Sequence, residues 1–285
     1  MKTNHIIGLI CLGAIWGSSF IFMRVLAPVL GPIATADFRV LLGGATLLIY
    51  YLVVGYNAEW KSNWRHYLVI GVLNSAIPFS LFSFAALHIP AGYSALLNST
   101  APLFGSVFSA LWLGEALTAR KLTGVVLGAS GVALVARIGV ANNIDEHFTI
   151  SLVACLVAAM CYSLTGIYIK KFASGAKSLG IAGASQLFAG LALLPILPFA
   201  PIRGEISSLV VANMLALAIL CSAIAYVLYF RLISEVGPTK ALTVTFLIPV
   251  FGMIWGAIFL NEPITMSMLG GAGLIVMGIW FVVRK

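Results

Sequence analysis

Long apolar stretches separated by short polar segments recur along the whole chain. Each stretch holds about the 20 apolar residues that a helix needs to cross the hydrocarbon core of a bilayer. The polar segments between them are too short to form soluble domains. We therefore predict an all-α integral membrane protein with ten transmembrane helices, at residues 6–25, 35–55, 66–88, 92–114, 119–138, 149–171, 178–199, 208–231, 238–260 and 266–284.

The composition strengthens this prediction, because 61% of the residues are hydrophobic and only 8% are charged. Soluble domains are about half apolar and about a quarter charged, so water is the wrong solvent for this chain. The first apolar run could be mistaken for a signal peptide, since Lys2 precedes it and the sequence ATA follows at 34–36. The run from Ile6 to Met23 has the length of a spanning helix, and we keep it as the first one.

The basic residues predict the orientation. If the N-terminus is cytoplasmic, most of the 16 lysines and arginines face the cytoplasm, and the outer side receives only Arg24, Arg39, Arg137 and Arg203. We predict a multi-pass protein of the inner membrane with both termini cytoplasmic. The net charge of +8 does not indicate nucleic-acid binding, because the basic residues are scattered between the apolar runs instead of forming a patch.

The chain also repeats itself. Residues 99–118 align without gaps on residues 246–265, so that Pro102 meets Pro249 and Glu115 meets Glu262. The same register joins the second to fifth helices with the seventh to tenth. We predict a first five-helix repeat at 1–138 and a second at 149–285. Because five is odd, the second repeat enters the membrane from the opposite side, which is the inverted arrangement of many secondary transporters.

Three motifs resemble a known family. The pattern P-x-F-G…L-x-E-x-L/I-T ends the fourth and ninth helices, DFRVLLGG opens the second, and WGSSF lies in the first. These residues are similar to the EamA-type branch of the drug/metabolite transporter superfamily. The resemblance implies ten helices, cytoplasmic termini and a central cavity with alternating access. It also implies export of amino acids, related metabolites or toxic compounds, whereas more distant relatives carry sugar nucleotides and sugar phosphates.

Three prolines lie inside predicted helices. A proline lacks its N–H, so Pro78, Pro102 and Pro249 each leave one carbonyl of the preceding turn without a partner. Irregular backbone at membrane depth is tolerated where it lines a watery cavity or is buried in protein. We expect hinges beside a substrate pathway; the alternative is that these prolines only bend helices for packing.

Helical spacing gathers aromatic and small polar residues on common stripes near these prolines. The stripes predict an aromatic, mostly neutral cavity with a few hydrogen-bonding groups, although each aromatic residue could instead serve packing. The candidate substrate-binding residues are Trp16, Ser19, Phe20, Asn74, Phe82, Asn98, Tyr162, Tyr226, Tyr229 and Thr245.

Five ionisable residues stand out because charge is costly at membrane depth. Asp37 is expected to cap the second helix, and Arg39 is expected to anchor the structure more than to touch substrate. His88 is interpreted as an interfacial residue, with proton coupling as the alternative. Glu115 and Glu262 are expected to fasten the turns that follow the fourth and ninth helices.

No catalytic motif occurs in the sequence, and its four cysteines lack metal-ligand spacing. We therefore predict no enzyme activity, cofactor or metal. The expected function is secondary active or facilitative export of amino acids or similar small amphipathic metabolites by alternating access. The alternatives are a carrier of sugar nucleotides or phosphate esters, and a non-transporting membrane enzyme or sensor. The expected partners are a small-molecule substrate and membrane lipid, and the sequence does not decide between monomer and homodimer.

Overall fold

The computed structural model describes residues 3–141 and 146–283, and within these ranges it contains helices and no strands. Nine helical segments are long and apolar enough to span a membrane, and the shorter apolar helix Val244–Leu260 makes a tenth crossing. Large apolar side chains such as Leu52 and Val53 lie 76% and 79% exposed on the outside, as a lipid-facing surface requires. The predicted all-helical membrane fold is confirmed.

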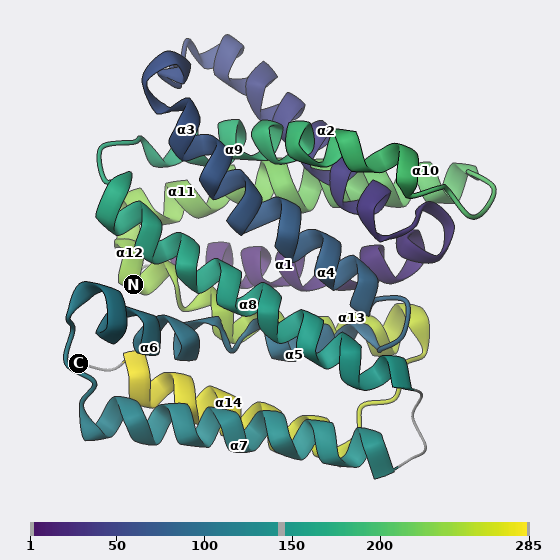
Figure 1. Ribbon diagram of the computed structural model, residues 1–285, viewed down its shortest axis with the longest axis vertical. Helices are drawn as coiled ribbons and strands as arrows, with labels where there is room; N and C mark the ends of the chain where they lie inside the picture. Colours follow the sequence, from purple (N-terminus) through teal and green to yellow (C-terminus); the bar gives the residue numbers. More distant parts are fainter. Residues whose placement is uncertain (1–2, 142–145, 284–285) are drawn as a thin grey trace.

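The ten crossings follow one another in chain order and run back and forth through the bundle (Figure 1). They are α1 Thr3–Leu30; α2 Pro32–Val54; α3 Trp60–Gly71 with η1 Val72–Ala76 and α4 Ile77–Ala85; α5 Ala91–Asn98 with α6 Ala101–Leu113; α7 Ala119–Ala141; α8 Glu146–Phe172; α9 Ser178–Leu193 with η2 Leu194–Phe199; α10 Ser208–Leu215 with η3 Ala216–Ile224 and α11 Ala225–Val236; α12 Pro238–Ala241 with α13 Val244–Leu260; and α14 Met266–Val283.

The first helix extends further than the sequence predicted. Its apolar pattern is interrupted at Arg24, yet α1 continues to Leu30. The Arg24 guanidinium donates a hydrogen bond of 2.5 Å to the carbonyl of Ala86, so the charge has a partner inside the protein and the helix can continue past it.

The prolines act less uniformly than predicted. Pro78 directly follows the π segment Val72–Ala76 within one continuous helical run. Pro102 lies in the first turn of α6, where the missing N–H costs little, and Pro249 lies inside α13. The break before α6 consists of Ser99 and Thr100, whose hydroxyls donate to carbonyls three residues earlier. The fourth crossing is therefore two helices.

The third and eighth crossings share another irregularity. Each contains a π-helical segment, Val72–Ala76 in the first half and Ala216–Ile224 in the second. In the register of the repeat, Ala225 stands where the third crossing has Pro78. The π segment of the eighth crossing ends next to Ala225, so this irregularity forms without a proline.

The helices pair in a pattern that is compatible with two inverted repeats. α1 packs on α13 as α8 packs on α6, and α2 packs on η3 as α9 packs on α3. These are the matches expected if each helix of one half has its counterpart five crossings later. The division into repeats at 1–138 and 149–285 stays our proposal.

The α7–α14 pair forms one edge of the bundle and is built on glycines (Figure 1). A methyl group on Gly278 would lie 2.5 Å from the Gly124 carbonyl oxygen and 2.8 Å from the Gly128 nitrogen. The two backbones can approach this closely only because these positions carry no side chain.

We predict that Gly278→Ala destabilises the protein by about 1–3 kcal/mol, since the added methyl group must push α7 and α14 apart. Gly273→Ala on the same helix is the matched control, because a methyl group there meets nothing within 4 Å. Thermal unfolding in detergent measures both variants. Equal melting temperatures for the two would contradict the close packing of this pair.

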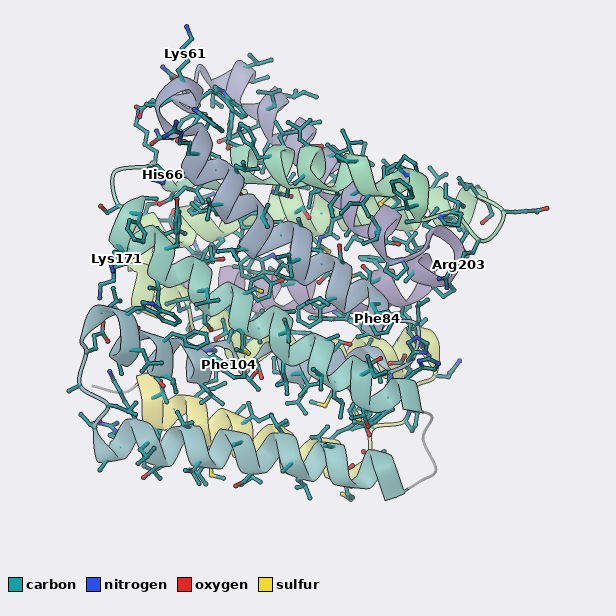
Figure 2. The ribbon with its side chains drawn as sticks, viewed as in Figure 1. Lys61, His66, Phe84, Phe104, Lys171 and Arg203 are labelled. Carbon is teal, nitrogen blue, oxygen red and sulfur yellow. The ribbon has the colours of Figure 1, made fainter. Side chains whose placement is uncertain are left out.

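The topology gives a second prediction. Figure 2 shows Lys61 and Lys171 at the end of the bundle where α1 begins, and Arg203 at the opposite end. Reporter fusions in segments 55–59, 114–118 and 173–177 should therefore report the cytoplasm, and fusions in 86–90, 200–207 and 261–265 the outside. A cytoplasmic report from the segment 200–207 would refute the orientation.

Candidate functional site

A cavity of about 680 Å³ lies at the centre of the bundle. Residues from both halves line it, on α1, α2, the third and fourth crossings, α8, α9, and the eighth and ninth crossings. α7 and α14 contribute none of its lining residues in the part of the chain that the structure describes. The cavity reaches Leu113, Lys170 and Leu242, which lie toward the end of the bundle where α1 begins.

The structure brings all ten candidate substrate-binding residues to this one cavity. Its lining includes Trp16, Ser19, Phe20, Asn74, Phe82, Asn98, Tyr162, Tyr226, Tyr229 and Thr245. Pro102 also lines it, whereas Pro78 and Pro249 do not. Contact of any of these residues with a substrate stays a prediction, but the stripes that helical spacing indicated do face a common space.

Aromatic rings form much of the wall and are fixed by contacts with one another. The indole N–H of Trp16 donates to the carbonyl of Cys221 at 3.2 Å, and its ring lies 5.1 Å from that of Tyr229 and 6.0 Å from that of Tyr226. Across the cavity, Phe82 contacts the rings of Phe20 and Tyr162. These rings offer apolar faces to a ligand and hold their own positions without one.

Neutral polar groups interrupt this aromatic wall. The Asn74 amide donates to the Tyr226 hydroxyl at 3.4 Å. Asn98 is the last residue of α5, directly before the break at Ser99 and Thr100, and its side chain is half-buried. The irregular backbone of the fourth crossing therefore lies at the cavity, as membrane physics requires of broken helices.

Arg39 brings the one positive charge to the middle of the cavity. Its side chain is 5% exposed, and its Nε donates to the Ser222 hydroxyl at 3.1 Å. The guanidinium lies 3.7 Å from the centre of the Phe79 ring, and Nη1 is 3.8 Å from the sulfur of Met23. The sequence favoured an anchoring role, whereas the structure makes Arg39 part of the cavity wall.

The sequence reasoning missed Phe79, although a signal was present. Phe79 lies three residues before Phe82, so the two share one face of α4. Met23 lies on the face of α1 that also carries Ser19 and Phe20. Both residues become important through Arg39, which comes from a different helix and could not be placed against them from local spacing.

An ionic network joins three crossings at the end of the bundle opposite to the start of α1. The Glu262 carboxylate accepts a hydrogen bond of 2.8 Å from the backbone N–H of Ala91, and lies 3.4 Å from Nε of Arg24. Arg24 also binds the Ala86 carbonyl. Burial raises the pKa of Glu262 above its usual value. The hydrogen bond from the Ala91 N–H and the charge of Arg24 lower this pKa by a smaller amount. Glu262 was expected to fasten its own turn, and it links α1 to the loop before α5 instead.

Glu115 forms the corresponding contacts at the other end of the bundle. Its carboxylate lies 2.8 Å from the ammonium of Lys170 and 3.5 Å from that of Lys121. Lys170 is 63% exposed, and the hydrogen bond from it lowers the pKa of Glu115. Glu115 thus fastens the turn to α7, as predicted, and also reaches α8.

Asp37 and His88 lie away from the cavity. α2 begins at Pro32 with Gly31 as its N-cap, so Asp37 sits in the second turn and does not cap the helix as the sequence suggested. Its carboxyl group is fully buried, and neither oxygen has a hydrogen-bond partner among the described residues. The His88 ring stacks on that of His147 with their centres 4.6 Å apart.

A membrane bundle with discontinuous helices around a central cavity is the architecture of secondary transporters. Sequence comparison identifies the family within that class. The EamA-like transporter family matches residues 4–137 and 149–284, and the chain belongs to this family.

Relatives extend over most of the chain. The uncharacterized transporter YvbV of Bacillus subtilis is 30% identical over 290 residues, covering 100% of this chain and 93% of that protein. A probable amino-acid metabolite efflux pump of Salmonella typhimurium is 24% identical and covers 93% of this chain and 90% of its own. A probable terminal-alkyne amino-acid exporter of Streptantibioticus cattleyicolor is 27% identical over 72% of this chain and 68% of its own.

A crystal structure of another protein shares the fold. It superposes with a TM-score of 0.66 at 20% sequence identity and covers 99% of this chain and 96% of that chain. Together with the apolar helices, the family membership shows that this is a multi-pass membrane transporter.

The Arg24–Glu262 network generates a prediction. Arg24→Ala should remove about 1–2 kcal/mol from the contacts that hold this end of the bundle together, because the lost contacts are charge-assisted but Arg24 is 31% exposed. Hydrogen exchange of a peptide covering residues 86–92 should become several-fold faster, since the Ala91 N–H depends on Glu262. Lys170→Ala, the equivalent change in the second half, is the control and should leave that peptide unchanged. Equal effects of both variants would show that the network does not hold this end closed.

Proposed function

We propose that the protein exports amino acids or similar small amphipathic metabolites across the inner membrane by alternating access. The observation that carries the proposal is the central cavity, which lies between residues of both halves and reaches toward one end of the bundle. At the other end, the Arg24–Glu262 network ties α1 to the loop before α5. This is the inward-facing arrangement of an alternating-access carrier.

The lining of the cavity supports small amphipathic substrates. Its volume of about 680 Å³ falls within the range of small-molecule sites. Aromatic faces of Trp16, Phe82 and Tyr162 suit an apolar body, and Asn98 and Thr245 supply a few directed polar contacts. Two relatives carry names as an amino-acid exporter and an amino-acid metabolite efflux pump, which agrees with this choice.

The alternative substrates fit less well. A sugar nucleotide or phosphate ester calls for several cationic groups, and the lining offers Arg39 and Lys170, the second of which is paired with Glu115 at 2.8 Å. An enzyme on lipid-linked substrates would need a catalytic cluster. Within the described residues, no group of three His, Cys, Asp or Glu side chains could hold a metal ion.

Alternating access assigns roles to the irregular segments. The break at Ser99 and Thr100 and the π segments Val72–Ala76 and Ala216–Ile224 all lie in crossings that line the cavity. Bending there exchanges which end is open, so the Arg24–Glu262 contact separates while the end near Lys170 and Glu115 closes. Substrate binds in the cavity while one end is open, and it leaves after that end has closed and the other end has opened.

Counterflow in proteoliposomes tests the proposal. Purified protein should exchange labelled amino acids from a panel that also contains nucleotides and cationic drugs, and an imposed pH gradient tests proton coupling through His88 or Asp37. Asn98→Ala should weaken the affinity several-fold, as expected for loss of one hydrogen bond of about 0.5–1.5 kcal/mol. Asn213→Ala is the matched control, because that amide binds its own helix at the Leu209 carbonyl, away from the cavity.

Exchange of nucleotides or cationic drugs with no exchange of amino acids would overturn the proposed substrate. Equal kinetics of the two asparagine variants, both well folded, would remove Asn98 from the site.

A further inference from the structure

The charge balance inside the cavity is incomplete. Arg39 is buried and positively charged, and no carboxylate lies within 4.0 Å of it among the residues that the structure describes. Among the residues described by the structure, the cavity lining contains no Asp or Glu. A charged side chain at membrane depth normally pairs with an opposite charge or with several dipoles, because the bilayer cannot solvate it.

We propose that Arg39 binds the carboxylate of the transported molecule, so that the substrates are organic monocarboxylates with an apolar body. The inference rests on the proposed function and narrows it. It makes the carboxylate, and not the amino group of an amino acid, the charged feature that the cavity recognises.

The contacts of Arg39 leave hydrogen-bond donors available for such a ligand. A guanidinium has five N–H donors. The Ser222 hydroxyl accepts a hydrogen bond from Nε of Arg39. Within the described residues, the acceptor of Nη1 is the sulfur of Met23, which is a weak acceptor. Phe79 covers one face of the guanidinium and fixes its plane, and no hydrogen bond to Nη2 is found within the described residues. A planar, partly satisfied guanidinium is suited to a carboxylate.

The second half of the chain shows that the fold does not require a charge at this position. Aligned in the register of the repeat, Arg39 meets Gln186 and Ser222 meets Ser75. Gln186 is buried, donates to the Ala182 carbonyl at 3.0 Å, and does not line the cavity. A neutral side chain therefore suffices for packing at this position of the repeat. The arginine is found in the first half, where the position lines the cavity.

The other cavity groups favour a monoanion over a zwitterion-specific site. An ammonium group would find only neutral partners there, such as the Tyr226 hydroxyl and the Asn98 amide. Those groups can accept a hydrogen bond but supply no opposite charge. Removing the amino group should thus cost little affinity, whereas neutralising the carboxylate should cost much.

Four probes that share one phenyl ring test whether the carboxylate matters more than the amino group. They are L-phenylalanine, 3-phenylpropionate, phenylalanine methyl ester and phenethylamine. Binding to the purified full-length protein is followed by tryptophan fluorescence, since Trp16 lines the cavity, and by thermal stabilisation. The two carboxylates should bind about ten- to hundredfold more tightly than the ester and the amine, the range expected for contacts to a charged group.

Variants separate this role from a structural one. Arg39→Gln copies the residue of the second half and should abolish the preference for carboxylates while the protein stays folded. Arg39→Lys keeps the charge without the planar donor pair and should retain part of the preference for carboxylates. Arg203→Gln, in the segment 200–207 outside the cavity, is the control and should bind like the wild type.

The outcomes are distinct. Equal binding of acid and ester, absence of carboxylate binding to the wild type, or an unchanged preference in Arg39→Gln would each overturn the inference. If Arg39→Gln does not fold, the difference between the affinities of the wild type for L-phenylalanine and for its methyl ester decides the inference. Carboxylate binding without amino-acid counterflow would leave the Arg39 site standing and refute only the proposed export.

Discussion

The hydrocarbon core of a membrane offers no hydrogen-bond partner, and the arrangement of this protein follows from that constraint. Each polar group inside the ten crossings must find a partner in the protein or face a watery space. Trp16 gives its N–H to a carbonyl of another crossing, and Ser99 and Thr100 bind carbonyls of their own helix. Asn98 lines the cavity together with the broken backbone of the fourth crossing, whereas the Asp37 carboxyl stays buried without a hydrogen-bond partner among the described residues. The cavity is thus one place where the chain can keep polarity that lipid would reject.

Much of the fold could be predicted because apolar length is a local property of the sequence. The spans 178–199 and 266–284 agree with the structure to within a residue or two, and the aromatic stripes do share one cavity. What escaped prediction depends on partners from distant segments. Arg24 does not end α1 because Ala86 binds it, Pro102 starts a helix instead of bending one, and the π segment of the eighth crossing has no proline to announce it. The place of Arg39 in the cavity wall likewise depends on Phe79 and Ser222 from other crossings.

The two halves have similar sequences but do not carry equal tasks. Arg39 faces the cavity and its counterpart Gln186 does not. Glu262 is 13% exposed where it meets Arg24, whereas Glu115 is 38% exposed where it meets Lys170. The two halves both line the cavity, and small differences of burial and charge distinguish their corresponding positions. The glycine contact of α7 with α14 takes no part in this division and holds both halves together at one edge.

The two ionic contacts differ in a way that has a kinetic consequence for the proposed transport. Glu115 already binds Lys170 while the cavity reaches Lys170, so under alternating access only the Arg24–Glu262 contact has to separate, and it favours the cavity open to the side of Lys170. The apparent dissociation constant on either side is the intrinsic one divided by the fraction of carriers open to that side. Half-saturation is therefore reached at a lower concentration from that side than from the other. Initial transport rates at a low substrate concentration then differ between the two sides, although the carrier remains reversible at equilibrium.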